Sequence, residues 1–175
     1  MINRVVLLGR LTKDPELTPL AAMTLLGCTT ASECVAGAVY ASMIHMSNFD
    51  EGMIAAAESR LGCPYVRGAK GPGSFDCSGF VYWCLKQAGA KTSYMTSVRW
   101  RTCSKYTRIE SMDQLKRGDI LVFSGSSDST GHVGIYMGGG RMIDASSSGG
   151  CVVIRSSIYS EYWSTHFLMG YRIWE

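Results

Sequence analysis

The order of its segments is the feature that most limits what this sequence can fold into. Two stretches with helical periodicity come before residue 90, and five short apolar runs separated by Gly, Ser and Asp come after residue 118. A long polar loop over residues 90–110 and a helical turn at 111–114 are expected between them. The five runs, each expected to form a strand, are residues 119–124, 132–137, 141–145, 151–155 and 167–173. Helices first and strands afterwards predict an α+β fold, in which a helix packs on a small antiparallel sheet.

Both expected helices have recognisable ends. In the first, apolar residues recur at helical spacing over residues 53–61, and Gly62 supplies a C-terminal stop. Asn48, with Glu51 three residues later, fits an N-terminal capping pair. The second helix begins near Cys77. Its apolar face comprises Phe80, Val81, Cys84, Leu85 and Ala88, and it ends at Gly89.

The first 49 residues differ from the rest of the chain. Residues 1–17 resemble the start of a bacterial single-stranded-DNA-binding protein, but the resemblance stops there. Such proteins need a complete five-stranded barrel with stacking aromatic side chains, and residues 18–49 continue neither pattern. We therefore divide the chain into a segment of unassigned structure at 1–49, interpreted as a fused fragment, and a folded domain at 50–175. No nucleic-acid partner is expected.

Composition narrows the class of protein further. The chain has 175 residues, of which 46% are hydrophobic and 18% charged, and this balance is typical of a globular protein. The net charge of +3 fits either a solvated basic face or attraction to an anionic polymer. The seven cysteines include no CxxC or CxxH pair, so we expect no metal site and no other cofactor.

Cys77 has the setting that thiol chemistry requires. It follows Asp76 and opens the second expected helix, where the positive end of the helix dipole favours the reactive thiolate. His132, at the start of an expected strand, is a candidate base that would take the thiol proton and later protonate a leaving amine. A turn at the glycines 138–140 would bring Asp144 on the next strand near this imidazole. On spacing alone, a solvent-facing aspartate that caps a turn is an equal alternative for Asp144.

Four blocks of sequence, in this order, resemble the NlpC family of cell-wall cysteine peptidases. They are residues 64–68 (PYVRG), 75–81 (FDCSGFV), 117–123 (RGDILVF) and 132–143 (HVGIYMGGGRMI). The resemblance runs from about Ile54 to Trp174. It implies a papain-like fold with a Cys-His-polar triad. It also implies hydrolysis of amide bonds in peptidoglycan stem peptides, typically after a γ-linked D-glutamyl residue.

The resemblance also implies a role for each residue of the triad. By position, Cys77 would be the nucleophile, His132 the base and Asp144 the third, polar member. Many relatives carry His at this third position, so Asp144 is a departure from the family pattern. A carboxylate orients an imidazole and stabilises the imidazolium well, so the change is chemically conservative.

Other residues would contact the substrate. Tyr65 matches the tyrosine whose hydroxyl lies beside the nucleophile, where it would donate to the developing oxyanion. Asp76 and Ser78 match the pair that in some relatives holds the free amine of the stem peptide. Arg67 stands where family members often have Trp, and Ala69 where they often have Gly. These two changes bear on the shape of the substrate groove.

Two other functions remain open at the level of sequence. One is a papain-like thiol amidase or acyl transferase on another substrate, because one scaffold hosts several reactions. The other is a non-enzymatic nucleic-acid-binding protein with a decayed peptidase domain. The resemblance implies a bacterial protein that is secreted or associated with the cell wall, although the sequence shows no clear export signal. We expect a monomer with no stable membrane span.

Overall fold

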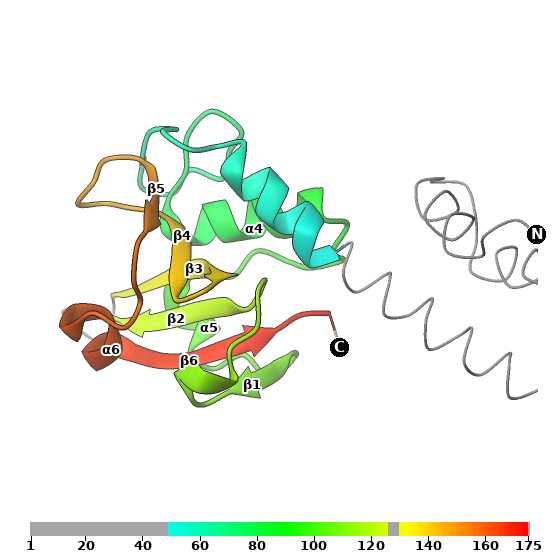
Figure 1. The fold of residues 1–175 in the computed structure, drawn as a ribbon. Helices are drawn as coiled ribbons and strands as arrows, with labels where there is room; N and C mark the ends of the chain where they lie inside the picture. Colours follow the sequence, from blue (N-terminus) through cyan, green and yellow to red (C-terminus); the bar gives the residue numbers. More distant parts are fainter. Residues whose placement is uncertain (1–48, 126–129, 175) are drawn as a thin grey trace, which may run out of the picture. The chain divides into compact units, whose positions relative to one another are not determined.

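One antiparallel sheet organises the described part of the chain, residues 49–125 and 130–174 of a computed structural model. Its strands lie in the order β1-β6-β2-β3-β4-β5 (Figure 1). Their bounds are β1 Thr107–Ile109, β2 Ile120–Ser124, β3 Gly131–Gly138, β4 Arg141–Ala145, β5 Val152–Arg155 and β6 Phe167–Arg172. The five predicted strands are therefore confirmed, with ends that agree closely. The expected long loop instead contains the short strand β1, which pairs with β6 at the edge of the sheet.

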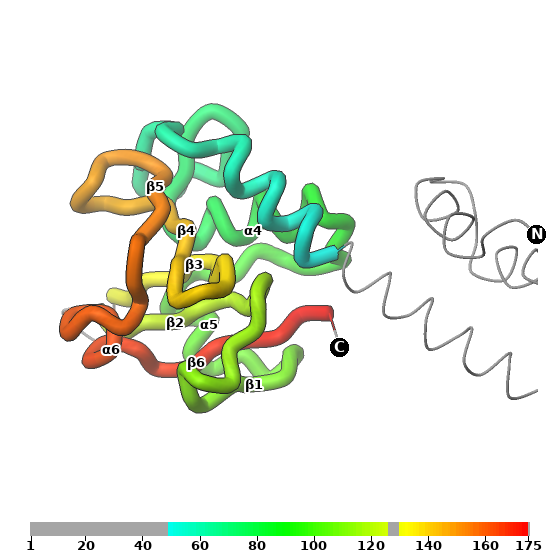
Figure 2. Tube along the Cα trace, in the orientation of Figure 1, coloured from blue at the N-terminus to red at the C-terminus, as the bar shows by residue number. Residues whose placement is uncertain are grey.

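Two helices pack on one face of this sheet. Residues 49–58 are helical, and α4 (Cys77–Gln87) lies against β3 and β4, as the tube trace in Figure 2 shows. The fully buried residues of this layer include Met53, Ile54, Phe80 and Val81 from the helices, and Ile120, Val133 and Ile135 from the strands. The predicted α+β architecture, with the Cys77 helix on a small antiparallel sheet, is confirmed.

A smaller cluster covers the opposite side of the strands. Leu121, Phe123, Tyr136, Met142 and Ile158 are buried there, and Trp163 and Phe167 pack against them. The short helix α6 (Glu161–His166) supplies Trp163. The predicted helical turn is present as a 3₁₀ turn at Met112–Gln114.

Two helical turns were not predicted, and both lack the signals on which sequence patterns depend. α5 (Ser97–Trp100) is a single turn capped by the Thr96 side chain, and the sequence analysis placed it in the long loop. α6 is six residues long and has no buried residue of its own. Helices this short show too little periodicity to be distinguished from polar loops.

A two-residue hairpin joins β3 to β4 and sets the geometry of the site. Gly138 pairs with Arg141, and the two residues between them, Gly139 and Gly140, have φ values of 60° and 76°. A tight turn with positive φ at both central positions favours glycine, because it has no Cβ. This turn fixes the register that places Asp144 beside the start of β3.

Residues Phe49–Glu175 form a compact unit of their own. The predicted segment at 1–49 falls outside the described residues except for Phe49, as does Asn48 of the expected capping pair. The domain boundary therefore stays a prediction. In the described ranges, no helix has the length and hydrophobicity needed to cross a bilayer.

Gly79 allows the start of α4 to lie directly against the preceding loop. A Cβ at this position would overlap the backbone carbonyl of Ala69 and lie 3.0 Å from the Cα of Lys70. The backbone N–H of Gly79 also donates to Oδ1 of Asp76 at 2.6 Å. A side chain here must push the loop away from the helix or move the helix from its cap.

We predict that Gly79→Ala lowers the free energy of unfolding by about 1–3 kcal/mol, the usual cost of overpacking. Gly52 is the matched control, because it is also helical and has no atom within 4 Å of an added Cβ. Gly52→Ala should raise stability by about 0.5–1 kcal/mol through helix propensity. Urea unfolding followed by circular dichroism measures both. Equal stabilisation by the two substitutions would contradict the assigned contact.

Candidate active site

Cys77 is the first residue of α4, and Asp76 caps the helix beneath it. The Asp76 side chain accepts hydrogen bonds from the backbone N–H of Gly79 and Gly68, the latter at 2.9 Å. Among the described residues, the backbone N–H groups of Cys77 and Ser78 have no acceptor. The thiol therefore lies beside unpaired donors at the positive end of a helix, a setting that favours negative charge.

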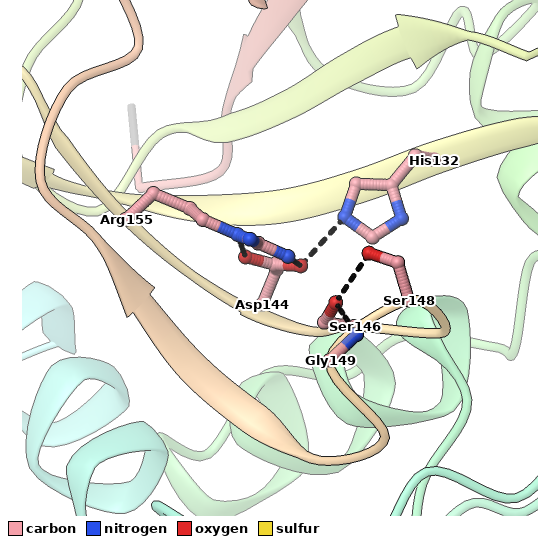
Figure 3. A network of polar contacts seen from close by, with 6 residues as sticks. All are labelled: His132, Asp144, Ser146, Ser148, Gly149 and Arg155. Atoms are coloured by element: carbon pink, nitrogen blue, oxygen red, sulfur yellow. Dashed lines mark hydrogen bonds and ion pairs between the residues drawn. The ribbon is translucent and has the colours of Figure 1, made fainter.

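His132 lies near the start of β3 and is held by Asp144 on β4. The Nε2 atom of His132 lies 2.9 Å from Oδ2 of Asp144, whose side chain is completely buried (Figure 3). An ionised carboxylate only accepts hydrogen bonds, so Nε2 carries the proton and Nδ1 is left for Cys77, which acts on the titration of His132. The structure thus brings together the three residues that the sequence suggested as a triad.

Gly134 leaves room for this contact. It lies between His132 and the rest of β3, and a Cβ there would be 2.6 Å from the sulfur of Met142 and 3.3 Å from the Cβ of Asp144. Because residues two apart in a strand share a face of the sheet, the His132 side chain and the open side of Gly134 lie on the same face. The imidazole can therefore reach the carboxylate diagonally.

Arg155 on β5 is a member of the site that the sequence analysis missed. Its Nε lies 2.9 Å from Oδ1 of Asp144, and its Nη2 lies 3.3 Å from Oδ2. Figure 3 shows Arg155 and His132 approaching the carboxylate from opposite sides. Asp144 pairs with Val153, so Arg155 is its diagonal neighbour, within reach of a long side chain. The register of the β4–β5 pair is the signal that could have revealed this contact.

The predicted substrate-contacting residues lie around the start of α4. Tyr65 is half-buried, and among the described residues its hydroxyl has no hydrogen-bond partner. The Ser78 hydroxyl lies 2.9 Å from Oδ1 of Asp76 and 3.0 Å from the hydroxyl of Tyr94, a neighbour that the sequence analysis missed. Arg67 is exposed. Asp76 therefore has a structural role as a helix cap, whatever it contributes to binding.

Comparisons with known proteins point to one family. The model of the NlpC/P60 family matches residues 62–172. This chain belongs to the NlpC/P60 family. A protein of Listeria grayi described as "Probable endopeptidase p60" is 36% identical over 119 residues, covering 68% of this chain and 22% of the relative. A protein of Escherichia coli K12 described as "Probable endopeptidase YafL" is 32% identical over 136 residues, covering 77% and 54%.

Solved structures agree with this assignment. The NlpC/p60 domain of the peptidoglycan hydrolase SagA is 32% identical with a TM-score of 0.56, over 70% of this chain and 97% of that one. The peptidoglycan hydrolase RipB of Mycobacterium tuberculosis is 26% identical with a TM-score of 0.59, over 74% and 67%. The match thus covers nearly all of the solved SagA domain, whereas the chain spans only 22% and 54% of the two curated relatives.

Electrostatics in this NlpC/P60 site favour a charged imidazole. Burial disfavours the imidazolium of His132, but the hydrogen bonds with Asp144 and Cys77, and the charges of both, outweigh it and raise its pKa to about 9. For Asp144, burial disfavours the charged carboxylate and so raises its pKa. The hydrogen bonds and charges of His132 and Arg155 lower this pKa more strongly, so the net shift is downward. At neutral pH the pair is therefore imidazolium and carboxylate.

The pKa of Tyr65 is raised, chiefly by burial and also by the charges of Cys77 and Asp76. Its hydroxyl therefore keeps its proton through the neutral range and can act as a donor. In the described ranges, no group of three or more His, Cys, Asp or Glu side chains could hold a metal ion.

We predict that the imidazole of His132 titrates near pH 9 in the wild type and at clearly lower pH in Asp144→Asn, which lacks the carboxylate. Nitrogen-edited NMR of the imidazole measures both titrations. Because the folded pKa is above the ordinary 6.5, the stability that this group contributes is full below pH 6.5 and is lost as the pH rises through about 9. An unchanged titration in Asp144→Asn would contradict the assigned cause.

Proposed function

We propose that this domain is a cysteine endopeptidase that hydrolyses amide bonds in peptidoglycan stem peptides, with the γ-D-glutamyl-diamino acid bond as its target. The observation that carries the proposal is the placement of Cys77 at a helix N-terminus beside an imidazole whose Nε2 donates to the buried Asp144. Membership of the NlpC/P60 family, with relatives named as peptidoglycan hydrolases, supports the substrate class.

In the first half of the reaction, the Cys77 thiolate attacks the carbonyl carbon of the scissile amide. The unpaired N–H groups at the start of α4 and the Tyr65 hydroxyl would donate to the oxyanion that forms. The His132 imidazolium then gives its Nδ1 proton to the leaving amine. The C–N bond breaks, and a thioester with Cys77 remains.

In the second half, water replaces the departed amine. Neutral His132 takes a proton from this water as the oxygen attacks the thioester carbonyl. The C–S bond breaks, the carboxylic acid leaves, and Cys77 and His132 return as thiolate and imidazolium. Asp144 keeps the imidazole in one orientation throughout and stabilises its charged form.

The acyl half of the substrate would lie on the Tyr65 side of the nucleophile. Ser78 and Tyr94 offer hydroxyl groups there, and the Asp76 carboxylate supplies negative charge that suits the free amine of a stem peptide. The domain would act on the wall as a secreted or wall-associated monomer. The basic excess of the chain, +3 overall, is compatible with an anionic wall polymer.

The test is digestion of purified muropeptides by the full chain, analysed by mass spectrometry. We predict cleavage between D-glutamate and the diamino acid by the wild type, and none by Cys77→Ser. Cys84→Ser is the matched control, because Cys84 is fully buried on the same helix. This variant should lose stability, by about 1–3 kcal/mol if the buried hydroxyl finds no partner, while it keeps the cleavage pattern.

Two other outcomes would overturn the proposal. If no muropeptide is cut but a thiol reagent still labels Cys77 rapidly, the amidase or acyl transferase function takes precedence. If Cys77→Ser cuts as well as the wild type, Cys77 is not the nucleophile. Binding to single-stranded DNA at low salt would instead support the nucleic-acid function.

Tyr65→Phe separates oxyanion stabilisation from substrate binding. Loss of the hydroxyl should reduce kcat by about 10²–10³-fold, because the bond to the oxyanion forms only in the transition state. KM should change little, since the aromatic ring remains. Steady-state kinetics on a defined stem peptide measures both constants. A rise in KM with an unchanged kcat would show that the hydroxyl contacts the ground-state substrate.

A further inference from the structure

A polar pocket of about 450 Å³ lies beside the candidate base. The described residues that line it include His132, Ser147, Ser148, Arg155, Tyr162 and Trp163. Cys77 is not among these lining residues, and neither are Tyr65, Asp76, Ser78 and Tyr94. The pocket is therefore on the base's side of the site, away from the region proposed above for the acyl half of the substrate.

The proposed mechanism determines which part of the substrate comes to this side. A base that protonates the leaving amine must lie within hydrogen-bond distance of that nitrogen. The leaving residue therefore starts at His132 and extends away from Cys77. A pocket lined by His132 and not by Cys77 is the space available to that residue.

The described side chains that line the pocket include positive charges and no negative one. Among the described lining residues, the charged side chains are Arg155 and the imidazolium of His132, and none is acidic. Asp144, which neutralises one of these charges, is completely buried behind them. A ligand that enters the pocket therefore meets the guanidinium of Arg155 and does not meet the carboxylate of Asp144.

Arg155 has donors left to contact such a ligand. Its Nε and Nη2 hold Asp144, whereas Nη1 has no partner among the described residues, and 27% of the side chain is exposed. The Trp163 ring lies under the guanidinium, with its centroid 5.4 Å from Cζ, and limits its movement. A fixed guanidinium with a free N–H edge is well suited to a carboxylate.

The serine turn below β4 adds neutral donors. Ser146 is buried, and its hydroxyl accepts from the backbone N–H of Gly149 at 2.8 Å. Ser148 lies 3.2 Å from Ser146, and Figure 3 shows its hydroxyl on the His132 side of the turn. Ser147 and Ser148 are exposed and line the pocket, so their hydroxyls can complete the coordination of an anion.

From this arrangement we propose that the pocket binds a carboxylate on the leaving residue of the substrate, with Arg155 as its main contact. The inference rests on the proposed endopeptidase function and adds a preference to it. Substrates whose leaving residue ends in a free carboxylate should be cut faster than substrates in which that group is an uncharged amide. Arg155 would then have two roles, orienting Asp144 and recognising the substrate.

The test compares two substrates that differ in this group alone. One is the tripeptide L-alanyl-γ-D-glutamyl-L-lysine with a free C-terminal carboxylate, and the other is the same peptide as its C-terminal carboxamide. We expect the wild-type kcat/KM to be about 10- to 100-fold higher for the free acid, the range expected of a charged hydrogen bond. Added salt should reduce this ratio.

Arg155→Gln separates the two roles of the arginine. Loss of its contact with Asp144 slows both substrates alike, whereas loss of the carboxylate contact slows only the free acid, so the ratio should fall towards one. Arg141→Gln is the matched control, because Arg141 is exposed on the neighbouring strand and does not line the pocket. It should leave the ratio unchanged.

Each other outcome is decisive. Equal wild-type rates on the two peptides would overturn the inference and leave the endopeptidase intact, and this comparison does not depend on whether Arg155→Gln folds. An unchanged preference in folded Arg155→Gln would remove Arg155 from recognition. Cleavage of neither peptide would remove the proposed function, and the inference that rests on it.

Discussion

The buried carboxylate of Asp144 is the constraint on which the rest of the site depends. A carboxylate with no exposed surface is costly unless its oxygens are paired, and here Nε2 of His132 and the guanidinium of Arg155 pair with both oxygens. The three residues belong to three consecutive strands of the sheet, β3, β4 and β5. A slip of one residue in either pairing would turn a partner to the opposite face. The geometry of the site therefore depends on the register of these strands.

The nucleophile is positioned by a separate set of contacts. Asp76 fixes the start of α4, and Gly79 lets the helix lie against the loop that precedes it. The helix is then placed on β3 and β4 by buried apolar contacts, with Phe80 and Val133 in one core. Cys77 is thus positioned by the Asp76 cap and by apolar packing, and not by the contacts that hold His132.

The sequence predicted those parts of the fold whose signals are local. The five long strands have apolar runs bounded by turn residues, and α4 has a cap, an apolar face and a stop. α5, α6 and β1 are too short for such a pattern. Asp144 could be placed beside His132 because one glycine turn joins their strands. Arg155 was missed because its partner Asp144 lies across a second strand pairing. Trp163 was missed because it lies on the short helix α6. Sequence periodicity records neither contact.

Arg155 also bears on the strength of the contact between Asp144 and His132, because both side chains bind the same carboxylate. A carboxylate stabilises the imidazolium strongly, and its contact with His132 helps to raise the pKa of His132 to about 9. An imidazolium held more tightly would be a weaker acid towards the leaving amine, and proton transfer is most efficient when the pKa lies near the working pH. Arg155 shares the charge of the carboxylate and so weakens its hold on the imidazole. In the proposed mechanism, this sharing of charge would help the imidazolium release its proton to the leaving amine.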